Sequence, residues 1–275
     1  MLDFDGGDKG AMARALAEIA LLAGPAVMEE YARAGEARAK ADGSPVTAAD
    51  ERAEAILVAR LHALAPGVAV VAEEACAAGA HLVAPPRFFL VDPLDGTREF
   101  LARNGEFTIN IGLVENGAPV AGAVFAPALK RIWFGGGGAA FAADVEVGAP
   151  LPETCQPLRV RPAPAALTAL ASRSHGDPRT EAFLTRLGVE TRISAGSSLK
   201  FCVIAEGRAD VYPRFAPTME WDTAAGDAVL RAAGGGVVGL DGSTLQYGKL
   251  AQSLRNAGFV GWGDPELTSR VVNAM

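Results

Sequence analysis

The chain has 275 residues, half of them hydrophobic, and its 25 basic and 32 acidic residues give a net charge of −7. This length can bury one large core or two medium ones, and the acidic balance argues against a surface that coats a nucleic acid polymer. The three cysteines are widely spaced and form no CxxC pair, which indicates neither a disulfide framework nor a zinc site and is typical of a reducing cytoplasm.

Acidic residues near the start of the chain argue against a signal peptide, which needs positive charge ahead of its apolar run. Asp3, Asp5 and Asp8 all lie within the first ten residues. The apolar stretches are interrupted before they reach the roughly 18 residues that indicate a membrane span. We therefore expect a cytoplasmic protein without a transmembrane segment.

The first half of the chain is predicted to hold two helices followed by a meandering sheet. Apolar residues at helical spacing indicate helices at 11–31 and 48–64. Runs rich in β-branched and aromatic residues indicate strands at 68–72, 88–91, 107–114, 119–127 and 131–134. Helices followed by such a sheet predict an α+β domain over residues 1–148.

A cluster of four glycines at 135–138 and the proline-containing loop at 150–152 mark the expected domain boundary. No Lys-Ser/Thr follows the glycines, as a phosphate-binding P-loop requires, so we expect a flexible loop there. Beyond it, strands predicted at 169–172, 191–194 and 209–212 alternate with helices predicted at 178–187, 198–206 and 223–233. This alternation predicts an α/β domain over residues 149–275.

The segment 89–97, Phe-Leu-Val-Asp-Pro-Leu-Asp-Gly-Thr, places two carboxylates three positions apart at the end of an apolar strand. Pro93 forces a turn there, so Asp92 and Asp95 can converge on one cation. The same turn exposes the carbonyl of Leu94 as a further oxygen ligand. This pattern is typical of a metal site.

Gly96 and Thr97 then open a helix, and backbone N–H groups at a helix N-terminus bind phosphate well. Metal and phosphate would thus meet at one point. Asp-Pro and Asp-Gly are also ordinary turn dipeptides, so an isolated segment of this kind is equally consistent with a plain turn. Acids elsewhere in the chain must decide between these interpretations.

Three other segments supply an acid at the boundary of a predicted element. Glu73 and Glu74 follow a predicted strand, Asp222 begins a predicted helix, and Asp50 lies in the polar segment before the second helix. Hard oxygen ligands of this kind select Mg²⁺ or Mn²⁺ over zinc. An N-cap role for Asp50 remains an alternative that is compatible with a metal role.

The acid pair after a strand at 73–74, the turn at 92–97 and the helix start at 221–226, Trp-Asp-Thr-Ala-Ala-Gly, resemble the signatures of the inositol monophosphatase-like, lithium-sensitive metallophosphatase superfamily. The resemblance covers about residues 11–236. It implies a layered αβαβα fold with the active site between two halves. The stretches 98–111 and 196–215 are similar to bacterial 3′(2′),5′-bisphosphate nucleotidases.

The resemblance implies a site with two or three Mg²⁺ ions, for which Mn²⁺ can substitute. Glu73, Asp92 and the Leu94 carbonyl would hold one ion, and Asp92, Asp95 and Asp222 would hold another. A third ion would be bound loosely through water.

The resemblance also implies the catalytic roles. Glu73 and the Thr97 hydroxyl would orient the attacking water, and Asp222 would lie near the leaving oxygen. Asp50 would support the water network around the loosest ion.

The implied substrate contacts come mainly from the second half. Lys200 and Arg214 are expected to bind the phosphates of a nucleotide, with Ser197 and Ser198 as neutral donors and His175 as a further contact. An exposed helix charge is the alternative for Lys200. Substrate contacts are also expected from residues around the metals, which are Leu94, Asp95, Gly96, Thr97 and Asp222.

These features predict a phosphomonoesterase that removes the 3′-phosphate from adenosine 3′,5′-bisphosphate. Preference for an inositol phosphate or a sugar bisphosphate is the alternative within the same chemistry. A catalytically silent protein that binds metal and phosphate is the alternative in a different class. We expect a monomer or homodimer, and analogy with relatives suggests peripheral association with the inner membrane.

Overall fold

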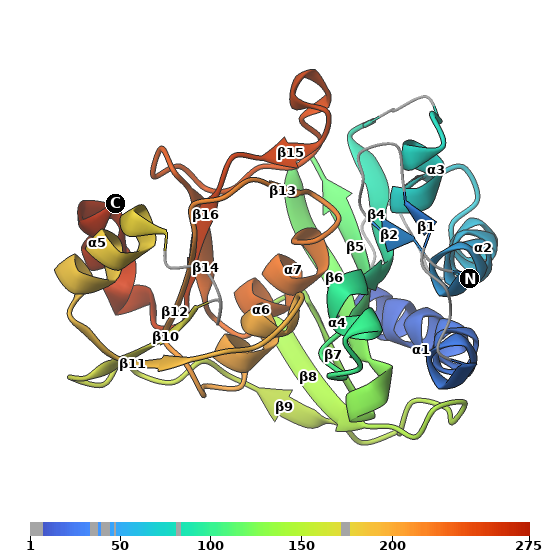
Figure 1. The fold of residues 1–275 in the computed structure, drawn as a ribbon, viewed down its shortest axis with the longest axis horizontal. Helices are drawn as coiled ribbons and strands as arrows, with labels where there is room; N and C mark the ends of the chain where they lie inside the picture. The colour runs from blue at the N-terminus through green and yellow to red at the C-terminus, as the bar shows by residue number, and fades with distance from the viewer. Residues whose placement is uncertain (1–7, 34–37, 40–44, 47, 81–83, 172–176) are drawn as a thin grey trace.

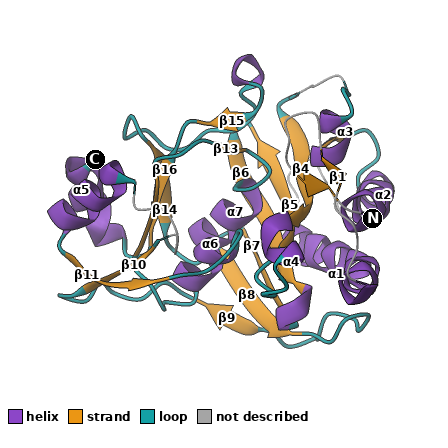
Figure 2. Cartoon of the chain, viewed as in Figure 1, coloured by secondary structure: helices purple, strands orange, loops and turns teal. Residues whose placement is uncertain are grey.

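The computed structural model describes residues 8–33, 38–39, 45–46, 48–80, 84–171 and 177–275. In Figure 1 the elements stack as alternating layers, with two sheets separated and flanked by helices. Figure 2 shows the same layers by secondary structure. The order helix, sheet, helix, sheet, helix confirms the predicted αβαβα layering.

The first sheet has seven strands in the order β3-β4-β5-β6-β7-β8-β9. Its strands are β3 (Ala69–Ala72), β4 (Arg87–Asp95), β5 (Thr108–Glu115), β6 (Ala118–Ala126), β7 (Arg131–Gly136), β8 (Ala139–Asp144) and β9 (Gln156–Leu158). β3 and β4 run parallel, whereas the pairs from β4 to β9 are antiparallel. The five predicted strands are confirmed, and β8 and β9 are additional.

The glycine cluster at 135–138 is not the predicted flexible loop. Gly135 and Gly136 end β7, and only Gly137 and Gly138 form the turn into β8. A Cβ on Gly135 would lie 2.8 Å from the Cβ of Ala232, so glycine is needed for close packing there. Because β9 pairs with β8, the first sheet also extends past residue 148.

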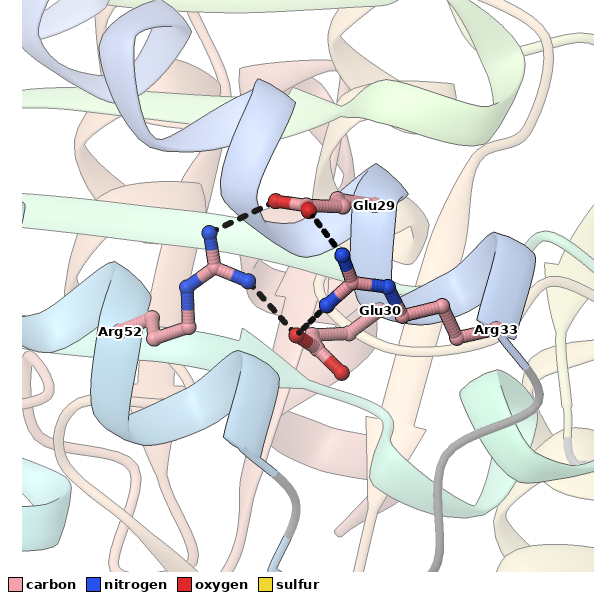
Figure 3. A network of polar contacts seen from close by, with 4 residues as sticks. All are labelled: Glu29, Glu30, Arg33 and Arg52. Carbon is pink, nitrogen blue, oxygen red and sulfur yellow. Dashed lines mark hydrogen bonds and ion pairs between the residues drawn. The ribbon is translucent and has the colours of Figure 1, made fainter.

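Two helices cover the outer face of this sheet, α1 (Lys9–Arg33) and α2 (Ala48–Leu64). The apolar side of both packs on β4, β5 and β6 in one core that includes Leu16, Leu57 and Phe125. Beside the core, Arg52 of α2 contacts Glu29 and Glu30 of α1, at 2.7 and 2.6 Å (Figure 3). These contacts join the end of α1 to the start of α2.

By length and composition alone, α1 is apolar enough to cross a membrane, contrary to the sequence-based expectation. Its most apolar window is 61% buried, however, against the sheet and α2. Core helices of globular proteins satisfy the same length and composition.

The second sheet has five strands in the order β11-β10-β12-β16-β14. Its strands are β10 (Leu167–Leu170), β11 (Val189–Ile193), β12 (Val211–Arg214), β14 (Gly236–Gly239) and β16 (Phe259–Trp262). The three predicted strands form its parallel half, with ends displaced by up to two residues. β14 and β16 were not predicted, and β16 pairs antiparallel with both β12 and β14.

Helices α6 (Leu199–Ala205) and α7 (Ala224–Ala232) lie between the sheets, as predicted. They share one core with both sheets, which contains Leu90, Phe201 and Phe259. Helices α5 (Pro178–Leu187) and α8 (Thr268–Ala274) cover the outer face of the second sheet around Phe183 and Val260. Two-stranded ribbons complete the fold, β1 (Arg38–Ala39) with β2 (Pro45–Val46) and β13 (Thr218–Met219) with β15 (Arg255–Asn256).

Candidate active site

Strand pairing brings the first two acidic segments together. β3 and β4 run parallel with Ala72 opposite Val91, so Glu73 and Asp92 follow at the same edge of the sheet. Glu73 is the first residue of the short helix α3 (Glu73–Ala77). This arrangement confirms the predicted acid pair at a strand end.

The next strand lines the same place with polar side chains. In the antiparallel pair β4 and β5, Asp92 lies opposite Asn110 and Asp95 lies opposite Thr108. Alternate residues of β5 face opposite sides of the sheet. Ile109 and Ile111 pack toward α1 and α2, so Thr108 and Asn110 face the layer of α6 and α7.

The segment after Asp92 is internally bonded. The Asp92 carboxylate is 1% exposed, and its Oδ1 accepts a hydrogen bond from the backbone N–H of Leu94 at 3.0 Å. Gly96 has a φ of 91°, a left-handed conformation that favours glycine, and it precedes helix α4 (Thr97–Leu101). The Thr97 hydroxyl lies 3.4 Å from the Leu94 carbonyl. The predicted helix start is thus confirmed. The predicted turn at Pro93 is not, because β4 continues to Asp95 with an irregular register between Asp92 and Asp95.

Helix α7 delivers Asp222 to this segment because two glycines let it approach the sheet. A Cβ on Gly112 would lie 2.9 Å from the Cβ of Ala224, and one on Gly122 would lie 2.5 Å from the Ala225 carbonyl oxygen. Larger residues at either position would push the helix off β5 and β6. Asp222, just before α7, is therefore held over the same sheet as Asp95.

Neutral donors hold the Asp222 carboxylate in place. Its Oδ2 accepts hydrogen bonds from the Thr218 hydroxyl and from the backbone N–H of Met219, the latter at 3.0 Å. Glu220, fully buried, accepts from the N–H groups of Gly248 and Lys249 at 2.6 and 3.0 Å. Glu220 thereby fastens the segment that carries Asp222 to a neighbouring loop.

Two serines before α6 connect the acids of the two halves. The Ser197 hydroxyl donates to Asp95 Oδ2 at 2.6 Å. The Ser198 hydroxyl lies 2.9 Å from the same oxygen and 2.7 Å from the Asp222 carbonyl oxygen. Asn110 donates to the Ser198 hydroxyl at 2.9 Å. Both serines thus face Asp95, and their predicted contacts with substrate stay predictions.

The acids of this cluster repel one another. Burial raises the pKa of Asp92, and the charges of Glu73, Asp95 and Asp222 raise it further. Burial and the charge of Asp95 raise the pKa of Asp222 to about 7, although the hydrogen bond from Thr218 opposes the shift. These four carboxylates therefore lie close enough to sense one another, as predicted.

The donor set fits a hard divalent cation. It combines four carboxylates that disfavour each other's charge, of which Asp92 is buried, with the Leu94 carbonyl, and such oxygens are the ligands of Mg²⁺. Within the described ranges, no group of three or more acidic, histidine or cysteine side chains has the geometry of a formed metal site. Asp95 and Asp222 instead point one oxygen at hydroxyl donors.

Asp50 belongs to helix α2. It is 1% exposed and lies in the first turn of α2, which begins at Ala48. The alternative that Asp50 is the N-cap is therefore wrong, because the helix starts two residues earlier. Its support of a loosely bound ion stays a prediction.

A cavity of about 980 Å³ opens from the acid cluster toward the second sheet. Asp95 and Asp222 lie at its acidic end, and its wall includes Lys200 and Arg214. Lys200 is half-buried, with Nζ 3.2 Å from the Ser197 carbonyl oxygen and 5.3 Å from the centre of the Tyr212 ring. It is therefore not the exposed helix charge of the alternative interpretation.

Arg214 is electrostatically linked to the acids. Burial lowers its pKa, but Tyr212 and the carboxylates of Asp222 and Asp95 outweigh burial and keep the pKa raised. The guanidinium therefore stays charged beside the cluster. His175, the remaining predicted contact, lies outside the described residues.

Several residues that build the site were not identified from the sequence. They are Glu54, Thr108, Asn110, Thr218 and Glu220. A signal did exist for two of them, since Thr108 and Asn110 are polar residues two positions apart in an otherwise apolar strand and must face the same side. The other three act through contacts between distant segments, which sequence spacing does not reveal.

Comparison with known proteins agrees with this geometry. The model of the inositol monophosphatase family matches residues 8–270. The chain belongs to the inositol monophosphatase family. This family depends on a divalent metal, generally Mg²⁺.

Similar members of the inositol monophosphatase family carry a more specific name. The 3′(2′),5′-bisphosphate nucleotidase CysQ of Salmonella typhimurium is 43% identical over 90% of this chain and 98% of its own length. CysQ of Escherichia coli strain K12 is 42% identical over 88% of this chain and 96% of its own.

Solved structures support the same assignment. CysQ from Bacteroides thetaiotaomicron superposes with a TM-score of 0.74 at 38% identity, over 92% of this chain and 97% of its own. The inositol monophosphatase from Anabaena (Nostoc) sp. PCC 7120 has a TM-score of 0.72 at 23% identity, over 96% of this chain and 94% of its own. The latter likeness concerns the fold alone.

Proposed function

We propose that this protein is a Mg²⁺-dependent phosphomonoesterase that hydrolyses the 3′-phosphate of adenosine 3′,5′-bisphosphate to give AMP and phosphate. The observation that carries the proposal is a single cavity with the half-buried carboxylates of Asp95 and Asp222 at one end and Lys200 and Arg214 in its wall. A substrate with two phosphates uses both features. The relatives named as 3′(2′),5′-bisphosphate nucleotidases support the same substrate class.

Glu73, Asp92, the Leu94 carbonyl, Asp95 and Asp222 would hold the metal, as two or three ions with Mn²⁺ as a substitute. Bound there, the cation offsets the developing charge on the phosphoryl group and lowers the pKa of water. The neutral donors around the acids keep each carboxylate oriented before metal binds. This preorganisation reduces the rearrangement that catalysis requires.

The other groups of the site bind and orient. The Thr97 hydroxyl, beside the Leu94 carbonyl, would orient the attacking water, with Glu73 as its second partner. The N–H groups of Gly96 and Thr97 would contact the phosphate that is removed. Asp222 would lie near the leaving oxygen.

Lys200 and Arg214 would bind the second phosphate. Fixing this distal group places the 3′-phosphate at the acid cluster, so its binding energy contributes to turnover as well as to affinity. We also propose that the protein acts in the cytoplasm as a monomer or homodimer.

The decisive experiment compares phosphate release from adenosine 3′,5′-bisphosphate, 5′-AMP and inositol 1-phosphate, each with Mg²⁺ and with a chelator. We expect the bisphosphate to have the highest kcat/KM. Lys200→Ala should reduce this preference and leave the chemistry intact. Lys130→Ala, which removes an exposed lysine paired with Glu146, is the matched control and should leave the preference unchanged.

Two outcomes would replace the proposal. If inositol 1-phosphate is the better substrate of the unaltered enzyme, the inositol monophosphatase alternative takes its place. If the protein binds Mg²⁺ but releases phosphate from none of the three compounds, a silent binding protein is the better interpretation.

A further inference from the structure

A buried glutamate outside the metal set holds the segment that carries Glu73. Glu54, on α2, is 9% exposed. Its Oε2 accepts a hydrogen bond from the backbone N–H of Glu74 at 2.7 Å, and its Oε1 accepts from the N–H of Ala75 at 2.8 Å. Both carboxylate oxygens are thus used on two consecutive N–H groups of α3.

Helix α3 needs this contact because it cannot stabilise its own start. The residue before it, Ala72, has no side-chain acceptor for the free N–H groups of the first turn. With five residues, α3 has little internal hydrogen bonding to fix its direction. The Glu54 carboxylate supplies the missing cap from another helix, and its negative charge suits a helix N-terminus.

The two bonds act directly on the position of Glu73. Glu73 is the residue that precedes the two bonded N–H groups, so a rotation of α3 that turned Glu73 away from Asp92 would break both bonds. Glu73 and Asp92 follow paired strands at the same edge of the sheet, and Glu73 is the foremost charge acting on Asp92. The cap therefore orients the carboxylate that faces the acid cluster.

Glu54 itself is firmly supported. It lies one turn after Asp50 on α2, between the buried residues Ala53 and Leu57. The start of α2 is tied to α1 through Arg52, Glu29 and Glu30 (Figure 3). Contacts thus extend from α1 through α2 to the segment that carries Glu73.

We propose that Glu54 is a positioning residue for the metal site, which sets the direction of Glu73 by capping α3. The inference rests on the proposed metal-dependent function. It concerns metal binding, so it is independent of which phosphorylated compound is the substrate.

Glu54→Gln tests this inference at nearly constant size. The amide keeps one acceptor oxygen but turns an NH₂ group toward the second backbone N–H, so one bond is lost and one buried donor is left without an acceptor. Asp264→Asn is the matched control, because Asp264 also accepts from two backbone N–H groups, those of Ala163 at 2.7 Å and Glu266 at 3.0 Å. Asp264 lies outside the acid cluster, on the outer side of the second sheet.

The readout is Mg²⁺ binding to the full-length protein without substrate, measured by isothermal titration calorimetry, together with the melting temperature in chelator. We expect Glu54→Gln to weaken Mg²⁺ binding by about 10–100-fold, as loss of an outer-shell partner typically does. Asp264→Asn should lower the melting temperature without changing Mg²⁺ affinity.

Unchanged Mg²⁺ affinity in folded Glu54→Gln, or an equal loss in Asp264→Asn, would overturn the inference. If Glu54→Gln does not fold, Glu54→Asp is measured instead. It keeps both oxygens on a shorter arm, so a smaller loss of affinity is expected and none would overturn the inference. A wrong substrate assignment is recognised separately, because wild type would then bind Mg²⁺ normally and fail only in the nucleotide assay.

Discussion

Asp222 and Asp227 lie at the two sides of the start of α7. Asp227 is fully buried, whereas Asp222 is half-buried in the wall of the cavity, and desolvation raises the pKa of both carboxylates. Asp227 is paired: Arg231 donates to Oδ1 at 2.6 Å and to Oδ2 at 3.1 Å, and the Tyr247 hydroxyl donates to Oδ2 at 2.9 Å. Among the described residues, no cation is hydrogen-bonded to Asp222, and its charged neighbours include Asp95 and Glu73.

This difference in hydrogen-bond partners distinguishes an acid with a structural role, Asp227, from an acid with a proposed functional role, Asp222. The fold also supplies a hydrogen-bonded cation to two other buried acids outside the proposed metal set, Asp210 with Arg161 and Glu220 with Lys249. At the cavity, Arg214 acts on Asp222 and Asp95 through its charge, but among the described residues it is not hydrogen-bonded to Asp222. Burying acids without a partner is costly, and an external cation that relieves the cost would be bound tightly for the same reason.

Glu73, Asp92, Asp95 and Asp222 form the uncompensated cluster, in which the acids repel one another. The largest effect on activity is expected when one of these charges is removed. Asp95→Asn keeps the shape of the side chain, so the fold should persist. Phosphate release should fall by more than the about 10–100-fold that loss of an outer-shell partner causes, because Asp95 is assigned as a direct ligand. The melting temperature in chelator should not fall, since repulsion with Asp222 decreases.

Phosphate release at saturating Mg²⁺ and calorimetry check this prediction. Asp144→Asn, which alters an exposed acid paired with Arg131, is the control and should change neither quantity. Release near the wild-type rate in Asp95→Asn would refute the assignment of Asp95 to the metal.

Asp227, Arg231 and Tyr247 form the compensated cluster, in which the buried acid has a cation partner. Removing this cation should lower the stability of the protein without changing its catalytic rate. Arg231→Met leaves Asp227 buried without its partner, which typically costs about 3–5 kcal/mol of unfolding free energy. Urea denaturation measures the loss, and kcat of the folded fraction should be unchanged. Arg33→Met, at an exposed ion pair, should cost about 1 kcal/mol or less. An equal loss of unfolding free energy in Arg231→Met and Arg33→Met would show that Asp227 does not depend on its buried cation.

The pH dependence of metal binding should reveal the uncompensated charge. In the folded metal-free protein Asp222 has a pKa of about 7, against 3.8 as its ordinary value. Between pH 3.8 and about pH 7, Asp222 is more protonated in the folded chain than in the unfolded chain. This group therefore makes the metal-free protein less stable as the pH rises. Each pKa unit corresponds to about 1.4 kcal/mol.

The stabilisation gained from saturating Mg²⁺ should therefore grow as the pH rises toward 7. Thermal melts with Mg²⁺ and with chelator across this range measure the difference, to which Asp92 contributes with the same sign because its pKa is also raised. A gain from Mg²⁺ that is flat with pH would contradict the raised pKa of Asp222.

The smallest effect is expected when the compensated cluster loses a neutral partner. Tyr247→Phe removes one hydrogen bond to Asp227 but leaves Arg231 in place, so about 1.5–3 kcal/mol should be lost. Combining it with Arg231→Met in a double-mutant cycle should give a non-additive loss, because both side chains bind the same carboxylate. Strict additivity would show that the two contacts are independent.

The sequence predicted elements best where a local pattern suffices. Helix α5 has its predicted bounds, Pro178–Leu187, because Asp177 caps it, Pro178 opens it and Gly188 ends it. β14 and β16 escaped prediction because they are short, contain glycine and are stabilised by pairing, β16 with β12 and β14 with β16, rather than by their own periodicity.

The acids of the proposed metal set could be found from the sequence because Glu73 begins α3, Asp95 ends β4 and Asp222 precedes α7, each within a recognisable motif. The supporting groups could not. Glu54 lies 20 residues from the N–H of Glu74 and Ser198 lies 103 residues from Asp95, so only the folded chain shows that they touch. The predicted serine contacts with substrate illustrate the same limit, since the serine hydroxyls were not expected to face Asp95.

Mutations in the segment 197–200 should affect both substrate binding and the acid cluster. Ser197 and Ser198 bind Asp95, and Lys200 lies in the wall of the substrate cavity two residues later. A mutation that reshapes this segment for a new substrate would also disturb a metal ligand, so gains in specificity would be linked to losses in turnover. The far wall of the cavity, with Thr180, Arg192 and Phe215, has no such link. Directed evolution of new substrates should therefore accumulate its first neutral or beneficial mutations there.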